Sequence, residues 1–538
     1  MSEPAPVDVL ILGGGLAGLT LGLQLHDRCP GLTIRILERR RHPAPAAAYK
    51  VGESMVEIGA HYLADTLGLR AHLDAGQIRK FGFRFFFSDG CTALDSAPEL
   101  GISRVFPTPT WQVERGTFEN FLGREVECRG IDFLQGVTVR AVETGTPHAV
   151  HATHGGAPRI HRTRWLVDAS GRAGLLRRQF GLDEDNGHHV GAAWMRIDAR
   201  LDVDRWCDNA AWRGLCDPPE RWRSTNHLCG PGYWVWLIPL ASGAHSIGIV
   251  ADAAMHPVES FNSCERMLAW LQVHQPALAR ELGKQSDTLL DFGFLRNVSH
   301  GCKQVFSHDR WALTGEAGLF LDPFYSPGSD FIAIANTYIT ELVARDSAGR
   351  MDARSVRHFQ QLFFSFYRST LALYRGQYPL FGNARVMTAK VLWDYAYYWG
   401  VLAPLAIGGW LADFALFADL SQELAEARTL NEGMQEFFRA WHAAGPDGQT
   451  MRWMDQQDLD WFARLNARLH DRLDDAGIRA RLREHVGLLH ALTGAVSAAA
   501  LRTQPGLHAD PLFEQAREGT RPALFDDLIG RRAAVATA

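Results

Sequence analysis

The sequence predicts an α/β protein that opens with a βαβ unit, continues through a β-rich insertion and ends in a mainly helical region. Three observations predict this class. Residues 7–12 form a short apolar run that ends in glycines, as buried parallel strands do. Residues 186–300 are β-rich in texture, and helical patterns dominate beyond residue 332. The chain has 538 residues, which is enough for several domain-sized units.

The elements follow in order along the chain. Residues 16–26 have helical periodicity, and residues 32–37 form a second β-type run that ends at Glu38. The opening therefore reads strand, glycine turn, helix, strand. We predict further strands at 83–87, 136–139, 233–240, 245–251 and 311–313, a helix at 116–128, and a strand that runs into a glycine turn at 165–171.

The predicted domains are four segments. Residues 1–185 and 301–345 are expected to form the two parts of the nucleotide-binding domain. Residues 186–300 are expected to form the β-rich, substrate-side insertion, and residues 346–538 the helical C-terminal region. Residues 395–412 carry no charged side chain, but Pro404 interrupts them, so we expect no membrane span. We expect a buried helix pair or the wall of an apolar pocket, and peripheral membrane contact is the alternative.

Composition excludes several classes of protein. Hydrophobic residues make up 46% and charged residues 21%, which excludes a mainly disordered chain, a collagen-like fibre and a coiled-coil rod. The net charge of −5 gives no reason to expect a nucleic-acid partner. The eight cysteines are scattered without zinc-ligand spacing, so we predict reduced thiols, a cytoplasmic protein and no metal site. The N-terminus carries no basic region typical of a signal peptide.

A glycine-rich turn follows the first strand directly. Gly13, Gly15 and Gly18 give the pattern G-x-G-x-x-G at the start of a helix, the context in which the motif is informative. The first glycine permits the tight turn, the second a close approach to a pyrophosphate, and the third close packing of helix on strand. Glu38 lies where a carboxylate accepts hydrogen bonds from a ribose, so the turn favours FAD or NAD over NADP.

Three features then favour FAD. Arg115 precedes a helix after a strand, as in flavoprotein monooxygenases. The segment Asp168-Ala169-Ser170-Gly171 resembles the D-A-S-G turn of the same superfamily. Residues 314–318 resemble its second flavin motif, with Glu316 where an aspartate is usual. The resemblance implies an FAD-binding Rossmann-like domain of the p-hydroxybenzoate-hydroxylase-like (GR2) type. The residues predicted to bind the cofactor are Gly13, Gly15, Leu16, Ala17, Gly18, Glu38, Arg39, Gly52, Glu53, Ser54, Arg115, Asp168, Gly315 and Glu316.

Two motifs go beyond flavin binding. Residues 234–239 read W-V-W-L-I-P, which fits W-x-W-x-I-P, and residues 320–328 read F-L-D-P-F-Y-S-P-G, which fits F-x-x-P-x-x-S-x-G. With the V-G-E-S segment at 51–54, they make residues 7–340 resemble a flavin-dependent halogenase of the tryptophan-halogenase-like superfamily. The two motifs distinguish that family from flavin monooxygenases.

The resemblance implies a mechanism and its participants. A partner reductase supplies FADH2, which reacts with O2, and chloride or bromide beside the flavin is oxidised to hypohalous acid. The acid passes through a tunnel to a lysine that delivers the halogen to an electron-rich arene. The family's lysine segment fits residues 79–85, so Lys80 is the predicted catalytic residue.

The halide site is expected in the second motif. Pro327 has no backbone N–H, so Gly328 and Ser329 are the remaining donors there. The predicted halide-site and active-site neighbours are Tyr325, Ser326, Pro327, Gly328, Ser329, Trp234 and Trp236.

Tyr325 bears on the substrate. Tryptophan halogenases carry a catalytic glutamate at this position, so its absence favours a phenolic, resorcinol-like or pyrrolic substrate, either free or bound to a carrier protein. The sequence thus resembles the phenol- and pyrrole-type members most. Two alternatives stay open: an FAD-dependent aromatic hydroxylase, and a non-catalytic flavin-binding or carrier-interacting protein.

Overall fold

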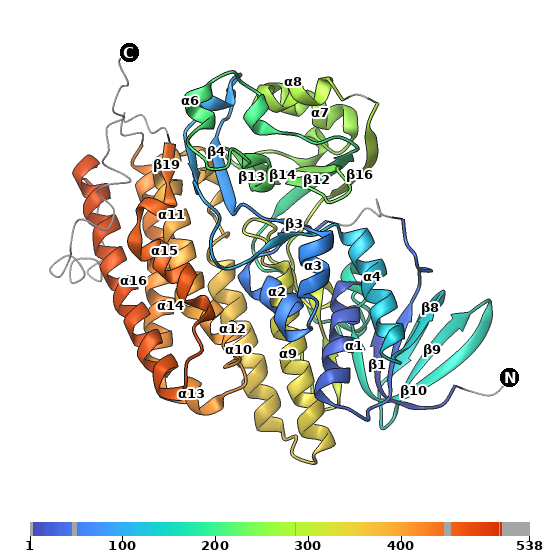
Figure 1. Cartoon of the computed structure of the whole chain (residues 1–538). Coiled ribbons are helices and arrows are strands. Elements are labelled where there is room, and N and C mark those ends of the chain that lie inside the picture. The colour runs from blue at the N-terminus through green and yellow to red at the C-terminus, as the bar shows by residue number, and fades with distance from the viewer. Residues whose placement is uncertain (1–3, 46–50, 286, 446–452, 505, 508–538) are drawn as a thin grey trace. The chain divides into compact units, whose positions relative to one another are not determined.

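The structure is a computed structural model that describes residues 4–45, 51–285, 287–445, 453–504 and 506–507 (Figure 1). The chain divides into two compact units. Unit 1 comprises Met1–Gln77, Val113–His188 and Val298–Tyr367. Unit 2 comprises Ile78–Gln112, His189–Asn297 and Arg368–Ala538. Each unit is described by itself.

Unit 1 is built on one sheet whose strand order is β7-β2-β1-β10-β9-β8, with β18 paired to β10. The core of the sheet is parallel, since β1 pairs in parallel with both β2 and β10. The strands are β1 (Val7–Leu12), β2 (Ile34–Glu38), β7 (Asp132–Gln135), β8 (Val137–Glu143), β9 (His148–His154), β10 (Ala157–Asp168) and β18 (Trp311–Leu313). Beside this sheet, β11 (Asp183–Glu184) pairs with β17 (Gly301–Cys302).

The predicted opening unit is confirmed. β1 has the predicted bounds, and α1 (Leu16–Arg28) connects it to β2, which ends at Glu38. The C-terminal half of β1 is apolar because its side chains are buried on both faces of the sheet. α1 packs against two other helices and against β2. The helices of unit 1 are α1, α2 (Glu57–His61), α3 (Arg70–Gly76), α4 (Arg115–Cys128), α5 (Leu175–Gln179) and α9 (Gly328–Ser347).

Unit 2 contains a mixed sheet in the order β16-β12-β15-β14-β13-β4-β5-β19. Its strands are β4 (Phe83–Phe87), β5 (Glu99–Gly101), β12 (Val190–Ile197), β13 (Thr225–Gly230), β14 (Tyr233–Pro239), β15 (His245–Asp252), β16 (Leu289–Leu295) and β19 (Trp453–Asp455). A short ribbon of β3 (Ile78–Arg79) and β6 (Trp111–Gln112) lies in the same unit.

The two faces of this sheet have different side chains. One face forms a hydrophobic core that includes Phe86, Val235 and Ile249, together with Met267 and Leu271 of α7 (Cys264–His274) and Leu278 of α8 (Pro276–Gly283). Because neighbouring side chains along a strand point to opposite faces, the residues at alternate positions lie on the other face. There Phe85 pairs with His227, and His227 pairs with Trp236.

The C-terminal part of unit 2 is helical. α11 is buried over its whole length and packs against α14 and α16, which lie side by side (Figure 1). The helices are α11 (Ala384–Tyr397), α12 (Ala403–Ile407), α13 (Phe414–Asp419), α14 (Ser421–Ala443), α15 (Asp460–Ala467) and α16 (Asp475–Thr503); α6 (Ala210–Arg213) also belongs to the unit, and α10 (Ala353–Leu371) connects the two units. The uncharged run at 395–412 spans the end of α11, a π-helical turn (Tyr398–Leu402) and α12. None of the helices within the described ranges is long and apolar enough to cross a membrane.

Residues 78–112 lie in unit 2, although the sequence pattern grouped them with the first part of the nucleotide-binding domain. The reason is a parallel pairing between distant segments. β4 pairs with β13 from Phe83 opposite Thr225 to Phe87 opposite Cys229. The four-segment division of the chain stays a prediction.

Candidate active site

The glycine turn of unit 1 has the geometry that its three positions require. Gly13 has a φ of 117°, and a Cβ there would lie 2.3 Å from the carbonyl oxygen of Ala169. A Cβ on Gly18 would lie 2.0 Å from the carbonyl oxygen of Gly13. A Cβ on Gly15 would have one atom of the described residues within 4 Å, a carboxylate oxygen of Glu119 at 4.0 Å, so this position leaves space beside it. Two glycines serve packing, and the third leaves room for a ligand.

The start of α1 fits the pyrophosphate of a dinucleotide. Gly15 is the N-cap residue and no side chain caps the helix, so first-turn N–H groups remain available to an anion. Glu38 accepts hydrogen bonds from the backbone N–H of Gly14 and of Arg40, both at 2.7 Å, which fixes its carboxylate over the turn. Of the other predicted contacts, Leu16 is buried, Ala17 is half-buried and Arg39 is exposed.

Arg115, the first residue of α4, forms hydrogen bonds with the segment 51–54, which follows the undescribed residues 46–50. Its guanidinium donates to the carbonyl oxygens of Val51 at 3.0 Å and Gly52 at 3.3 Å, and forms an ion pair with Glu119 at 2.6 Å. The N–H of Val113 donates to the carbonyl oxygen of Glu53 at 2.6 Å. Glu53 and Ser54 are both buried. The predicted residues Gly52, Glu53, Ser54 and Arg115 are thus brought together.

Asp168 supports the backbone of its own turn. Its two carboxylate oxygens accept hydrogen bonds from the N–H groups of Ser170 at 2.9 Å and Leu176 at 2.7 Å. Burial raises the pKa of this carboxyl group, and the hydrogen bonds oppose that effect. These hydrogen bonds stabilise the backbone turn at Asp168, which lies beside the glycine turn.

The second flavin motif lies in a short 3-10 helix after β18. Gly315 has a φ of 59°, and a Cβ there would lie 3.0 Å from the Cβ of Ala17, so the motif packs against the first turn of α1. Glu316 is partly exposed and pairs with Arg172 at 3.2 Å. The structure therefore brings the two predicted flavin motifs together within unit 1.

The predicted halide segment is a strained turn that leads into α9. Tyr325 and Ser326 have φ values of 65° and 55°, in the left-handed region that L-residues avoid. Pro327 is the N-cap of α9, with no side-chain cap, so the N–H groups of Gly328 and Ser329 lie in the first turn of this helix. The hydroxyl oxygen of Ser329 is buried and has no hydrogen-bond partner among the described residues. The Ser329 hydroxyl is packed against α2, since a Cβ on Gly59 would lie 2.3 Å from it. The N–H groups at the start of α9 are the donors that an anion at this turn would use.

Lys80 lies in unit 2, between the β3–β6 ribbon and β4. Its side chain is only 3% exposed, and its ammonium nitrogen lies 3.5 Å from the centre of the Phe83 ring. Its backbone N–H donates to the carbonyl oxygen of Thr110 at 2.9 Å. The surroundings are aromatic, since Phe83 also contacts the ring of His227 at 5.1 Å and that of Tyr395 at 6.1 Å. Lys80 thus places an amine in a buried, aromatic setting in this unit.

The two tryptophans of the W-x-W motif lie on the same face of the sheet as Phe85 and His227. The indole N–H of Trp234 donates to the hydroxyl of Tyr378 at 3.0 Å, and that of Trp236 donates to Ser246 at 3.1 Å. A Cβ on Gly248 would lie 2.1 Å from the Trp236 ring, so a glycine is required opposite it. Both tryptophans are buried and form part of this face of the sheet.

His227 is a neighbour of Lys80 that no sequence motif indicates. Its ring stacks on Phe85 with centres 4.6 Å apart, and its Nδ1 lies 3.2 Å from the carbonyl oxygen of Arg84. Burial, and then the charge of Lys80, lower the pKa of His227 to about 3, so the imidazole is neutral at ordinary pH. In the sequence, only the two-residue spacing of His227 and Cys229 along a strand indicates that these two side chains share a face. The pairing of β13 with β4, which brings His227 beside Phe85, cannot be read from the sequence.

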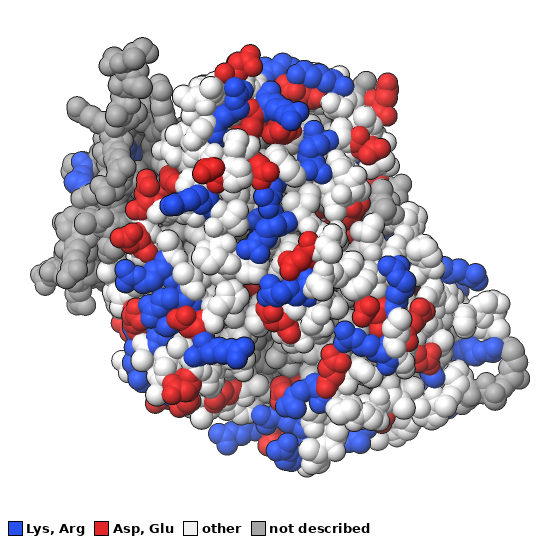
Figure 2. Space-filling model, in the orientation of Figure 1, with Lys and Arg blue, Asp and Glu red and all other residues white. Residues whose placement is uncertain are grey.

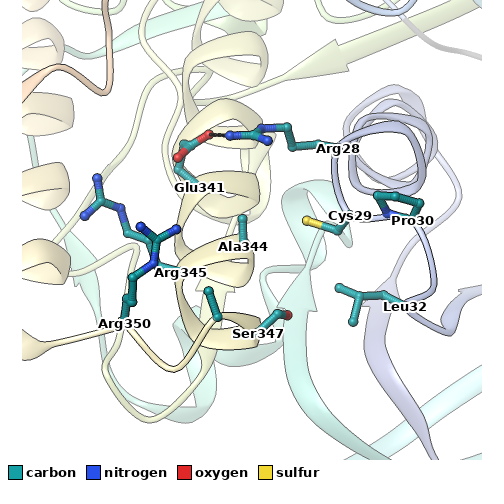
Figure 3. Close-up of a pocket in the computed structure, with 10 residues that line it drawn as sticks. Arg28, Cys29, Pro30, Leu32, Glu341, Ala344, Arg345, Ser347 and Arg350 are labelled. Carbon is teal, nitrogen blue, oxygen red and sulfur yellow. Dashed lines mark hydrogen bonds and ion pairs between the residues drawn. The ribbon is translucent and has the colours of Figure 1, made fainter.

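A separate cavity of about 600 Å³ lies in unit 1 between the C-terminal ends of α1 and α9 (Figure 3). Since both glycine-turn and halide-segment residues lie at the N-terminal ends of these helices, the cavity is not the candidate site. Figure 3 shows Arg28 directed toward Glu341, with which it pairs at 3.4 Å. The lining residues are Arg28, Cys29, Pro30, Leu32, Glu341, Ala344, Arg345, Ser347, Ala348 and Arg350.

Neither the charges on the face drawn in Figure 2 nor metal-ligand clusters among the described residues indicate another site. Basic and acidic side chains alternate over the face drawn in Figure 2. No group of three or more His, Cys, Asp or Glu side chains among the described residues is arranged to hold a metal ion.

Comparisons with known proteins show which proteins this chain resembles. Residues 6–235 match the family described as FAD binding domain. The flavin-dependent halogenase chlA of Dictyostelium discoideum is 26% identical over 440 residues, which cover 74% of this chain and 71% of that protein. The 1H-pyrrole-2-carbonyl-[peptidyl-carrier protein] brominase of Pseudoalteromonas luteoviolacea is 27% identical over 335 residues, covering 62% of this chain and 75% of that protein.

The fold is shared with solved halogenases. The crystal structure of halogenase PltM in complex with phloroglucinol and FAD superposes with a TM-score of 0.65 at 16% identity, covering 90% of this chain and 96% of that chain. The predicted α/β fold with its FAD-binding domain is confirmed. The chain thus resembles flavin-dependent halogenases in sequence, carries an FAD-binding domain and shares the fold of solved halogenases.

Proposed function

We propose that this enzyme halogenates an electron-rich aromatic substrate with FADH2, O2 and a halide, and that Lys80 delivers the halogen. The observation that carries the proposal is the burial of Lys80 among aromatic rings, 3.5 Å from the centre of Phe83. A lysine in such surroundings is shielded from bulk water, which protects a reactive halogen species from quenching.

The residues of unit 1 divide into those that hold FAD and those that hold the halide. Gly13, Gly15 and the first turn of α1 are proposed to bind the pyrophosphate, and Glu38 the ribose. Arg115 is proposed to fix the 51–54 segment against the cofactor. Gly328 and Ser329 are proposed to bind the halide through their N–H groups. Bound reduced FAD supplies the activation of O2 that oxidises the halide to hypohalous acid.

Lys80 is proposed to act on hypohalous acid in one of two ways. Its amine either donates a hydrogen bond that polarises the acid, or reacts with it to give an N-haloamine and water. In the second case the halogen passes from nitrogen to the arene carbon, and the nitrogen takes up the proton that the ring loses. Both ways return the lysine to its starting state.

Phenolic, resorcinol-like or pyrrolic substrates fit the site better than tryptophan. Tyr325 offers no carboxylate to stabilise the cationic ring, so the substrate must stabilise it through its own oxygen or nitrogen. Two relatives support this class, because phloroglucinol is bound in the PltM structure and the Pseudoalteromonas brominase acts on a carrier-bound pyrrole. We propose a flavin reductase as partner and a substrate either free or carrier-bound. The eight cysteines are all free, which supports a reducing, cytoplasmic setting.

A substrate panel tests the proposal. Purified protein is supplied with FAD, a flavin reductase, NADH and bromide, and is offered phenols, resorcinols, pyrroles and tryptophan. We expect a brominated phenol, resorcinol or pyrrole, identified by its isotope pattern. A hydroxylated product whose yield is independent of halide would instead support the hydroxylase alternative, and NADH oxidation by the isolated chain would point the same way.

A further inference from the structure

The 320–328 loop, which leads into the proposed halide donors Gly328 and Ser329 at the start of α9, is strained at two neighbouring positions. Tyr325 and Ser326 both have positive φ values, of 65° and 55°. Of the described residues, Arg310 is the one other non-glycine residue with positive φ. Since such a conformation costs free energy, surrounding contacts must hold it.

Asp322 provides one such contact from within the loop. It is fully buried, and one carboxylate oxygen accepts a hydrogen bond from the N–H of Phe324 at 2.8 Å. The other oxygen lies 2.6 Å from Nε2 of His188, which is 4% exposed. The carboxylate thus ties the backbone just before the strained pair to a ring from a distant segment. A short, charge-assisted contact of this kind is stronger than a neutral hydrogen bond.

The His188 segment is itself fixed by a buried network. The backbone N–H of His188 donates to the side-chain oxygen of Asn186 at 3.1 Å. The Asn186 amide donates to the hydroxyls of Ser299 at 2.8 Å and Tyr367 at 2.9 Å. The Ser299 hydroxyl donates to the carbonyl oxygen of Phe320 at 3.1 Å. The network therefore contacts the loop at two positions, Phe320 and Asp322.

We propose that His188 and Asp322 are positioning residues for the halide, which hold the 320–328 loop in the strained conformation that presents the N–H groups of Gly328 and Ser329. The inference rests on the proposed function of this loop. Neither residue is proposed to touch the halide. A relaxed loop would turn the donors away from the anion while leaving the glycine turn at Gly13 unchanged.

The test compares two substitutions at His188. His188→Gln keeps an N–H donor at about the reach of Nε2, whereas His188→Leu keeps similar bulk without a donor. We expect His188→Leu to raise the apparent KM for bromide about tenfold or more, with the Kd for FAD changed less than twofold. His188→Gln should stay within about threefold of the parent protein in its bromide KM.

A second measurement follows binding without turnover. Sodium bromide should raise the thermal unfolding midpoint of the FAD-free protein relative to sodium acetate at equal ionic strength, because a ligand of the native state stabilises it. The bromide-dependent rise should disappear in His188→Leu and persist in His188→Gln. If His188→Leu does not fold, Asp322→Asn replaces it: the amide oxygen can still accept from Phe324 while the charged contact to His188 is lost, so bromide KM should again rise.

Asp346→Asn is the matched control, because this buried aspartate near the opposite end of α9 pairs with Arg164 at 2.8 Å. It should lower the unfolding midpoint but leave bromide KM and the bromide-dependent rise unchanged. The inference is overturned if His188→Leu behaves like the parent protein toward bromide, if His188→Gln is impaired as much as His188→Leu, or if Asp346→Asn raises bromide KM equally. If the parent protein uses no halide at all, the proposed function fails as well, and the two failures are thereby distinguished.

Discussion

The ammonium nitrogen of Lys80 lies 3.5 Å from the centre of the Phe83 ring, three residues further along the chain. The two residues are held in place by separate backbone contacts. The Lys80 backbone is bonded to Thr110, and β4, which carries Phe83, is paired with β13. A lysine fixed over an aromatic face loses less conformational entropy when it engages a ligand than a freely rotating one does. This pair is the centre of the proposed delivery site.

Replacing Lys80 should abolish halogenation without affecting the cofactor. In Lys80→Ala we expect the halogenation rate to fall by roughly 10²-fold or more, because the amine that holds or carries the halogen is lost. FAD affinity should be unchanged, since Lys80 lies in unit 2. Free hypohalite should leak and be detected with monochlorodimedone. Lys284→Ala is the control, since this exposed lysine pairs with Glu281 on the surface. Regioselective product from folded Lys80→Ala at the parent rate would contradict the assignment.

Gly15→Val should fold and lose FAD. The Cβ of residue 15 would meet little besides open space, so the variant avoids a clash in the native state. The added branch occupies the space where the pyrophosphate approaches, so we expect FAD affinity to fall by several kcal/mol, at least about 100-fold. Flavin fluorescence quenching measures the Kd, and circular dichroism checks folding.

Two further glycine variants serve as references for that measurement. Gly487→Val, on α16 with nothing within 4 Å of its added Cβ, should bind FAD normally. Gly18→Val should not fold, because its Cβ would lie 2.0 Å from the Gly13 carbonyl oxygen. Normal FAD affinity in folded Gly15→Val would rule out the proposed cofactor position.

Arg115→Met should weaken FAD binding by loosening the 51–54 segment. The substitution removes the hydrogen bonds to the carbonyl oxygens of Val51 and Gly52. We expect the Kd for FAD to rise about tenfold, equivalent to about 1.4 kcal/mol. Arg129→Met, at the other end of α4, is the control, because Arg129 pairs with Asp27 at the surface. Equal losses of affinity in both variants would indicate a general effect on α4 rather than on the segment.

Acid should destabilise the protein through its buried histidines. Burial, followed by the charge of Lys80 for His227 and of Arg200 for His245, lowers the pKa of each to about 3, against about 6.5 in an unfolded chain. Between these values the unfolded state binds more protons, so the free energy of unfolding falls as pH decreases from about 6.5 toward 3. Each histidine contributes at most about 1.4 kcal/mol per pH unit.

Urea unfolding between pH 7 and pH 5 measures this slope. His245→Gln should reduce the loss of stability per pH unit, because one buried imidazole no longer has to be charged on acid unfolding. His308→Gln should leave the slope unchanged, since His308 is exposed. An unaltered slope in folded His245→Gln would show that other groups carry the acid sensitivity.

Local sequence patterns predicted much of unit 1. The apolar run at 7–12 became β1 with those bounds, because a fully buried strand needs only short-range continuity of apolar residues. Position alone was enough to interpret the glycines at 13, 15 and 18 and the acid at 38. Each of them satisfies a steric or hydrogen-bonding requirement within one βαβ unit. The same reasoning could not assign His188 or His227, whose partners lie more than 130 residues away.

The sequence by itself predicted the fold class and the resemblance to flavin-dependent halogenases, and it supplied the proposals for the FAD-binding turn and the lysine segment, because these depend on residue type at fixed local spacing. Only the tertiary structure decided which distant side chains share an environment. The pairing of β4 with β13 brought His227 to the Lys80 face, and the return of the chain at 320–328 brought Asp322 to His188. The physical reason is that burial and hydrogen bonding are properties of spatial neighbours, and non-local strand pairing and helix packing select those neighbours independently of their separation along the chain.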